Sequence, residues 1–99
     1  MEKPNAQQRV LRIIPVMAGH ELDGIAPGGL AKKLQTTPSN ISRDLRILQS
    51  EGFVELVPGL DNRWRLSPKM IQIARSHMMG IERMEARLKE VEQRYSRDF

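Results

Sequence analysis

Residues 27–50 read PGGLAKKLQTTPSNISRDLRILQS, and this stretch carries the clearest structural signal of the chain. A proline opens each of two segments, 27–34 and 38–50, and suits the first position of a helix, where its missing N–H has no acceptor. Apolar residues recur at helical spacing in both segments. Thr37 supplies a hydroxyl that can cap the second one. The pattern predicts two short helices joined by a turn of three residues.

The predicted helix over 38–50 has two different faces. The face expected to be buried carries Ile41, Leu45 and Leu48, at spacing i, i+4 and i+7. The opposite face gathers small polar residues and arginines, namely Ser39, Ser42, Arg43 and Arg46. Asp44 lies at the edge of the buried face, and we expect Lys33 or Arg12 to neutralise it.

The flanking segments complete one small domain. Residues 5–19 have apolar side chains at helical spacing, behind a capping-box pattern that starts at Asn5. The segments 53–57 (FVELV) and 63–67 (RWRLS) are rich in strand-forming residues, and the turn PGLDN separates them. They predict a β-hairpin in which Trp64 points inward and the neighbouring arginines point outward.

Residues 69–99 form one long predicted helix, which Ser67 caps. Its apolar residues follow a 4-3-4-3 spacing, which is a heptad seam. Beyond Gly80 little of the domain is left to cover this seam, so we expect a second copy to cover it. Arg87 falls at a g position and Glu92 at an e position, an arrangement that favours a parallel or bundled homodimer. The residues predicted to form the dimer are His77, Ile81, Met84, Leu88, Val91 and Tyr95.

Composition excludes several classes of protein. The chain has 99 residues, a net charge of +4, a pI near 10.0 and no cysteine, which suits one domain with a basic lean. No apolar run has the roughly 18 residues of a membrane span, and the N-terminus lacks a signal peptide. We therefore expect a cytoplasmic protein that does not act at a membrane. No carboxylate pair, nucleophile–base set or metal-ligand spacing appears, so we expect no enzyme, no catalytic residue, no metal and no cofactor.

Two short helices, a tight turn and a basic hairpin are together the parts of a winged helix-turn-helix. The predicted fold is mainly α with a small β-hairpin (α+β), with a DNA-binding domain over 1–68 and a coiled-coil-like dimerisation helix over 69–99. A helix over 38–50 has the right diameter for the major groove, and the wing over 53–66 can reach the backbone or the minor groove. The residues predicted to contact DNA are Thr37, Pro38, Ser39, Asn40, Ser42, Arg43, Arg46, Asn62, Arg63 and Arg65.

The stretch from Arg9 to about Leu66 resembles the N-terminal winged-helix domain of the IclR family of bacterial transcriptional regulators. VLRIIPVMAG resembles the opening helix of that domain, and GLAKKLQTTPSNISRDLRILQSEGFVELV resembles its helix-turn-helix without a gap. NRWRLSPKMIQIA resembles the returning wing strand and the following helix. The resemblance implies DNA binding through the helix over 38–50 and dimerisation outside the helix-turn-helix. The large ligand-binding domain of the family has no counterpart before Phe99, so no small-molecule effector is expected.

These observations predict a homodimeric, sequence-specific transcriptional regulator that binds double-stranded DNA at an inverted-repeat operator. Two recognition helices of such a dimer would dock in successive major grooves. The alternative is a winged-helix module for protein–protein interaction, which would use the Met-rich C-terminal helix. Retention on random duplex DNA at low salt separates the two, since even non-specific DNA binding appears there.

Overall fold

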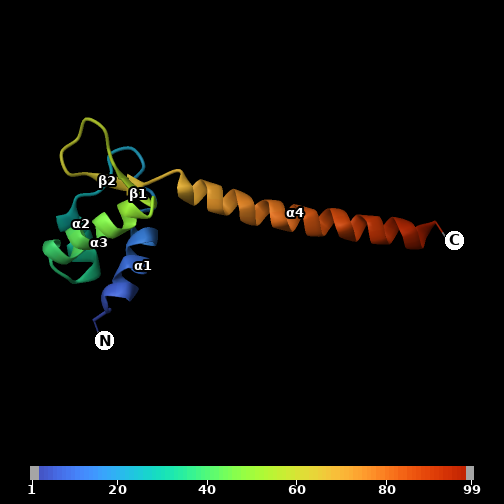
Figure 1. Cartoon of the computed structure of the whole chain (residues 1–99), viewed down its shortest axis with the longest axis horizontal. Helices are drawn as coiled ribbons and strands as arrows, with labels where there is room; N and C mark the ends of the chain where they lie inside the picture. Colours follow the sequence, from blue (N-terminus) through green and yellow to red (C-terminus); the bar gives the residue numbers. More distant parts are fainter. Residues whose placement is uncertain (1–2, 98–99) are drawn as a thin grey trace. The chain divides into compact units, whose positions relative to one another are not determined.

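The computed structural model describes residues 3–97 and consists of four helices and one two-stranded sheet (Figure 1). The elements are α1 (Ala6–Met17), α2 (Pro27–Leu34), α3 (Pro38–Ser50), β1 (Val54–Leu56), β2 (Trp64–Leu66) and α4 (Lys69–Ser96). The chain divides into two compact units, with the boundary between Lys69 and Met70. The predicted fold class, mainly α with a small hairpin and a long C-terminal helix, is confirmed.

Side chains satisfy the first backbone N–H groups of α1 and α3, whereas α2 begins at a proline without a side-chain cap. Asn5 and Gln8 form the predicted capping box: Gln8 N donates to Asn5 Oδ1 at 2.8 Å, and Asn5 N donates to Gln8 Oε1 at 3.0 Å. The Thr37 hydroxyl accepts from Asn40 N at 3.2 Å and so caps α3. Between α2 and α3, Gln35 adopts a left-handed conformation that ends α2 and makes the tight turn. The helices predicted over 27–34 and 38–50 are therefore confirmed.

One core joins the three short helices to the hairpin. The predicted stripe of α3 is buried, and residues from α1, α2, β1 and β2 pack against it. Trp64 of β2 is buried, as the alternation of inward and outward residues along the strand predicted. The fully or almost fully buried apolar residues are Ile13, Met17, Leu30, Ala31, Ile41, Leu45, Leu48 and Val54. Because this core covers one side of α3 only, the other side of the helix is left at the surface.

The sheet is antiparallel, with Val54 opposite Leu66 and Leu56 opposite Trp64. Its strands are one residue shorter at each end than the predicted segments. The next residues still form backbone hydrogen bonds, of 2.8 Å from Val57 N to Arg63 O and 2.9 Å from Ser67 N to Phe53 O. A third piece of extended chain was not predicted. Ile25 bridges Trp64 through two hydrogen bonds, of 2.8 Å from Ile25 N to Trp64 O and 3.0 Å from Trp64 N to Ile25 O. Gly24 permits this approach, since a Cβ there would lie 2.8 Å from the Trp64 carbonyl oxygen.

Asp44 is buried on α3, and its partner differs from the one expected. The carboxylate pairs with Arg9 of α1, in a salt bridge to Nε and a hydrogen bond of 3.1 Å from Nη2 to Oδ1. The expectation of Lys33 or Arg12 was wrong. Both of these side chains are exposed, whereas Arg9 lies on the buried face of α1.

The second unit consists of the helix α4 from its second residue on, since α4 begins at Lys69, the last residue of the first unit, and runs to Ser96. The Ser67 hydroxyl accepts from Lys69 N at 3.2 Å and so provides the predicted cap. Taken alone, the helix buries none of its own side chains completely. In the part of the chain that the structure describes, no helix is both long and apolar enough to cross a membrane.

Candidate nucleic-acid interface

The outward face of α3 presents the residues predicted to read DNA. Ser39, Arg43 and Arg46 are exposed, and Ser42 is half-buried beside them. Within residues 3–97, neither the Arg43 nor the Arg46 guanidinium makes a hydrogen bond or an ion pair. Each arginine therefore keeps its five N–H donors available for a carboxylate, a phosphate or a base edge.

Asn40 lies at the side of this face with its amide held in place. Asn40 Nδ2 donates to the Thr36 hydroxyl at 3.0 Å, which fixes the orientation of the amide plane. The amide oxygen and the second N–H are left to form the acceptor–donor pair that matches the major-groove edge of adenine.

A small hollow lies at the N-terminal end of α3, where the helix dipole is positive. Its volume is about 190 Å³, and Thr37 and Asn40 of the predicted site are in its wall. Five further residues of the wall were not predicted for the site, because they come from the N-terminal segment, from α1 and from the turn before α3. These are Lys3, Pro4, Arg9, Gln35 and Thr36. Pro38, at the first position of the helix, is exposed close to this end.

The predicted wing residues form contacts within the first unit. Arg63 donates from Nε to the Asp23 carbonyl and from Nη2 to the Gly24 carbonyl, both at 3.0 Å. Asn62 has a left-handed backbone, and its side-chain oxygen accepts from Trp64 Nε1 at 3.1 Å. Arg63 thus holds the wing against the loop before Ile25, and Asn62 joins the turn of the wing to Trp64. The sequence indicated neither role.

Arg65 is held in a similar way. Its Nη2 lies 3.0 Å from a carboxylate oxygen of Glu55 on the paired strand, and its Nη1 donates to the Glu21 carbonyl at 3.3 Å. The structure therefore separates the ten predicted DNA contacts into two groups. The α3 residues gather on one accessible face, and the three wing residues are engaged with neighbouring backbone or side chains.

The predicted dimerisation residues all lie exposed along one side of α4. Met84 is 71% exposed and Leu88 58% exposed, and Ile81 and Val91 flank the same apolar groove. His77 and Tyr95 continue the row at its two ends. A row of this length left in water is unfavourable, because each large side chain gains about 1.5–3 kcal/mol on full burial.

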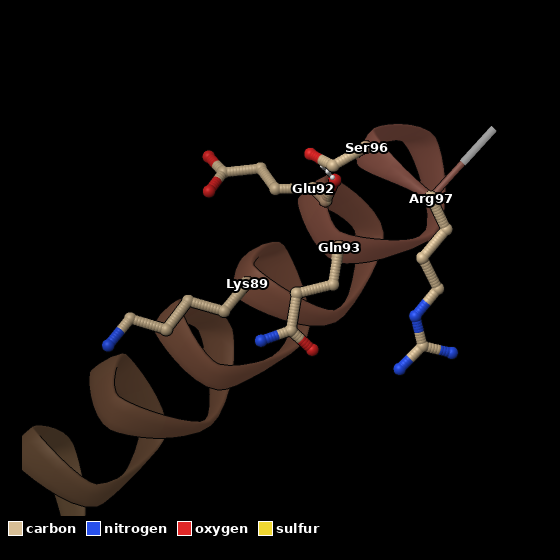
Figure 2. A pocket seen from close by; sticks show the side chains of 5 residues that line it. All are labelled: Lys89, Glu92, Gln93, Ser96 and Arg97. Carbon is tan, nitrogen blue, oxygen red and sulfur yellow. Dashed lines mark hydrogen bonds between the residues drawn. The ribbon is translucent and has the colours of Figure 1, made fainter. Parts of the chain in front are cut away.

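A second concavity on α4 lies on its polar side. Figure 2 shows five side chains that extend from successive turns of the same helix, with one hydrogen bond of 2.8 Å from Ser96 Oγ to the Glu92 carbonyl. Because a single helix supplies the whole lining, this is a surface depression and not a binding cavity. The lining residues are Lys89, Glu92, Gln93, Ser96 and Arg97.

Two groups in the first unit have shifted pKa values. The hydrogen bond to Asp44 raises the pKa of Arg9, so the buried guanidinium stays charged. The Gly19 N–H donates to Glu21 at 2.9 Å and lowers the pKa of that exposed carboxyl. Over residues 3–97, His, Asp and Glu side chains nowhere gather in the groups of three that a metal ion needs.

Comparison with solved structures supports a winged-helix fold for this chain. A solved structure describing how the Zalpha domain of Cyprinid herpesvirus 3 ORF112 binds Z-DNA matches with a TM-score of 0.53 and 24% sequence identity. The match covers 64% of this chain and 98% of the Zalpha chain. No protein-family model matches the chain, and neither does any curated protein. The winged-helix part of the IclR resemblance is therefore confirmed, and its family-specific part is not.

Proposed function

We propose that this protein is a homodimeric, sequence-specific regulator that binds double-stranded DNA through α3. One observation carries the proposal: the accessible face of a winged-helix α3 holds two arginines, Arg43 and Arg46, without partners in residues 3–97. A helix of this kind fits the major groove, and arginine reads guanine or holds phosphate there. The role is one of binding, with no catalytic step.

Base contacts come from the first three turns of α3 in this proposal. Arg43 or Arg46 pairs with guanine, and the fixed amide of Asn40 pairs with adenine. Ser39 and Ser42 are small enough to let the helix approach the base edges. Backbone N–H groups at the N-terminus of α3 donate to a phosphate of the DNA backbone, and this contact sets the register of the helix without reading sequence.

In this proposal the wing has a smaller part in DNA binding than the sequence predicted. Arg63 and Arg65 hold the hairpin against the loop 21–24, and this loop carries Ile25 into the sheet. We therefore propose that these arginines act mainly on the position of the wing. Their contact with DNA stays a prediction, as it does for Asn62.

A second copy of the chain covers the seam of α4 in this proposal. The flanking charges are complementary in a parallel pair, since Glu85 and Glu92 fall at e positions and Arg87 and Arg94 at g positions. In an antiparallel pair g would meet g and e would meet e, so that like charges would face each other. The pairing places two α3 helices on one duplex, and an inverted repeat matches their two-fold symmetry.

The experiment is selection of bound sites from random-sequence duplex DNA with the full-length chain. We expect a two-fold symmetric motif with half-sites about 34 Å apart, or one helical turn. Sedimentation of the same sample is expected to show a dimer. DNA binding without any enriched motif would contradict sequence-specific recognition.

The Zalpha neighbour supplies a further arm of this test. That protein binds Z-DNA, so a CG-repeat duplex held in the Z form is compared with the same duplex in the B form. The proposal predicts that the selected B-form site binds best. Preference for the Z form over every B-form site would contradict the proposed groove reading and favour recognition of DNA shape.

A second candidate function rests on α4 itself. The helix by itself leaves its apolar row uncovered, and Met78, Met79 and Met84 are adaptable apolar contacts. This observation favours a protein-interaction module that captures a different helix. Absence of any retention on random duplex at about 50 mM salt would favour this candidate, because non-specific DNA binding is strong at low salt.

A further inference from the structure

One apolar residue stands on the accessible side of α3. Ile47 lies in the third turn and is 49% exposed, and it does not belong to the core cluster of the first unit. It follows Arg43 by four residues and Asn40 by seven, a spacing that places the three in one row along the helix. This row is part of the face that the proposed function assigns to DNA.

The position of Ile47 excludes several of the roles that its neighbours can have. An isoleucine side chain has no hydrogen-bond donor, so it holds neither a phosphate oxygen nor a polar base edge. Water is an unfavourable environment for it, at a cost that grows with apolar area. Arg46 and Arg43, beside it, favour an anionic ligand on the same face, which points to nucleic acid and not to an apolar protein surface.

The major groove offers one apolar group on an ordinary base pair, the 5-methyl group of thymine. From Asn40 to Ile47 the helix rises by about 10 Å, at 1.5 Å per residue. A helix that lies along the groove passes about three base pairs over that length, at about 3.4 Å per base pair. A row that begins with an amide and ends with an apolar side chain can therefore follow consecutive base edges.

We propose that Ile47 is a specificity-determining residue that packs against the 5-methyl group of a thymine in the bound site. This inference rests on the proposed function and adds to it a base preference at one position. The thymine lies beside the base or phosphate that Arg43 contacts, because the two side chains are one turn apart on the same side of α3.

The experiment removes the thymine methyl group from the DNA and, separately, most of the Ile47 side chain from the protein. Each thymine of the selected duplex is replaced in turn by 2′-deoxyuridine, and binding is measured for the wild type and for Ile47→Ala. At one position in each half-site, the wild type is expected to bind about fourfold more weakly, the effect of one buried methyl group. The Ile47→Ala variant is expected to bind the two duplexes equally.

Two controls separate this contact from a loss of folding or of general binding. Leu11→Ala removes a similar side chain, 68% exposed on α1, and is expected to keep the full discrimination between thymine and deoxyuridine. Thermal unfolding of Ile47→Ala is expected to match that of the wild type, since this side chain is outside the core.

The possible results distinguish this inference from the function on which it rests. If wild type and Ile47→Ala respond equally to every deoxyuridine, while Arg43→Ala still weakens binding to the selected site, the thymine contact is wrong and the proposed function stands. If the wild type binds the selected duplex and a scrambled duplex equally, the thymine contact and the proposed sequence-specific function are both wrong.

Discussion

Arg9 of α1 and Asp44 of α3 form a buried ion pair, with Asp44 1% exposed and Arg9 9% exposed. Two N–H groups of one guanidinium reach both oxygens of the carboxylate, a geometry that only arginine provides. The pair joins α1 to the helix that carries the proposed DNA contacts. It therefore fixes the rotation of α3 about its axis, and with it the face that Arg43 and Arg46 present.

Replacement of either partner of this pair is expected to destabilise the protein. Asp44→Leu or Arg9→Met leaves one buried charge without its counter-ion, and the loss is expected to be about 3–5 kcal/mol in the free energy of unfolding by urea. The double variant is expected to recover most of this loss, because neither charge is then buried. An Asp44→Leu variant as stable as the wild type would show that the pair is dispensable.

Arg43→Ala tests how α3 reads its site. If Arg43 pairs with a base, the change is expected to cost about 1–3 kcal/mol on the selected duplex and to relax preference at one position. Arg12→Ala is the matched control, since Arg12 is an exposed arginine of α1. An equal loss on all sequences would instead identify Arg43 as a phosphate contact.

Arg63→Ala tests the role that the structure gives to the wing. The variant loses two charge-assisted hydrogen bonds, to the Asp23 and Gly24 carbonyls. Each bond of this kind contributes about 1.5–3 kcal/mol to the free energy of unfolding. The variant is expected to unfold at lower urea concentration, while the salt dependence of its DNA affinity stays unchanged. A reduced salt slope with unchanged stability would show that Arg63 contacts phosphate instead.

Leu88→Asp tests the seam of α4. Leu88 lies in the apolar seam, at an a position of the heptad, and a carboxylate there cannot be buried between two helices. Sedimentation is therefore expected to show a monomer at concentrations where the wild type is a dimer. Gln93→Ala is the control, because Gln93 lies on the polar side of α4 shown in Figure 2. A dimer that persists in Leu88→Asp would contradict the seam.

Charge exchange then tests the direction of the pair. Arg87→Glu is expected to weaken a parallel dimer, since it meets Glu92 of the other copy, and adding Glu92→Arg is expected to restore it. Restoration is measured as the dimer dissociation constant at low salt, where exposed ion pairs are strongest. A single Arg87→Glu change that strengthens the dimer would indicate an antiparallel pair.

Glu21 gives the loop before Ile25 a dependence on pH. The Gly19 N–H favours the charged carboxylate, so the pKa of Glu21 in the folded protein lies below that in the unfolded chain. The contact is therefore present above the unfolded pKa and is lost as the pH falls through the folded one. In NMR titrations the Gly19 amide is expected to follow the Glu21 carboxyl, and Glu21→Gln is expected to abolish the response. Equal pKa values in the folded and urea-unfolded chain would exclude the contact.

Local signals in the sequence predicted the helices well. Thr37 and the prolines at 27 and 38 mark helix starts by their own chemistry, so both helices of the helix-turn-helix were predicted with their observed bounds. The spacing of the apolar residues predicted the buried face of α3, and the polar residues between them predicted the accessible face.

The features that the sequence did not predict depend on contacts between distant segments. Ile25 joins the sheet through two hydrogen bonds to Trp64, and a single bridged residue has no periodicity to detect. Arg9 looked like one cation among sixteen, since nothing in its spacing indicates Asp44, which is 35 residues away. The same reason applies to Arg63, whose acceptors are backbone carbonyls that no sequence pattern marks.

The most direct test of the central claim is an NMR titration of the full chain with its selected duplex. If α3 enters the groove, backbone amide shifts are expected to be largest over 37–47, with smaller changes in the wing. Shifts confined to α4, with α3 unchanged at saturating DNA, would contradict the account.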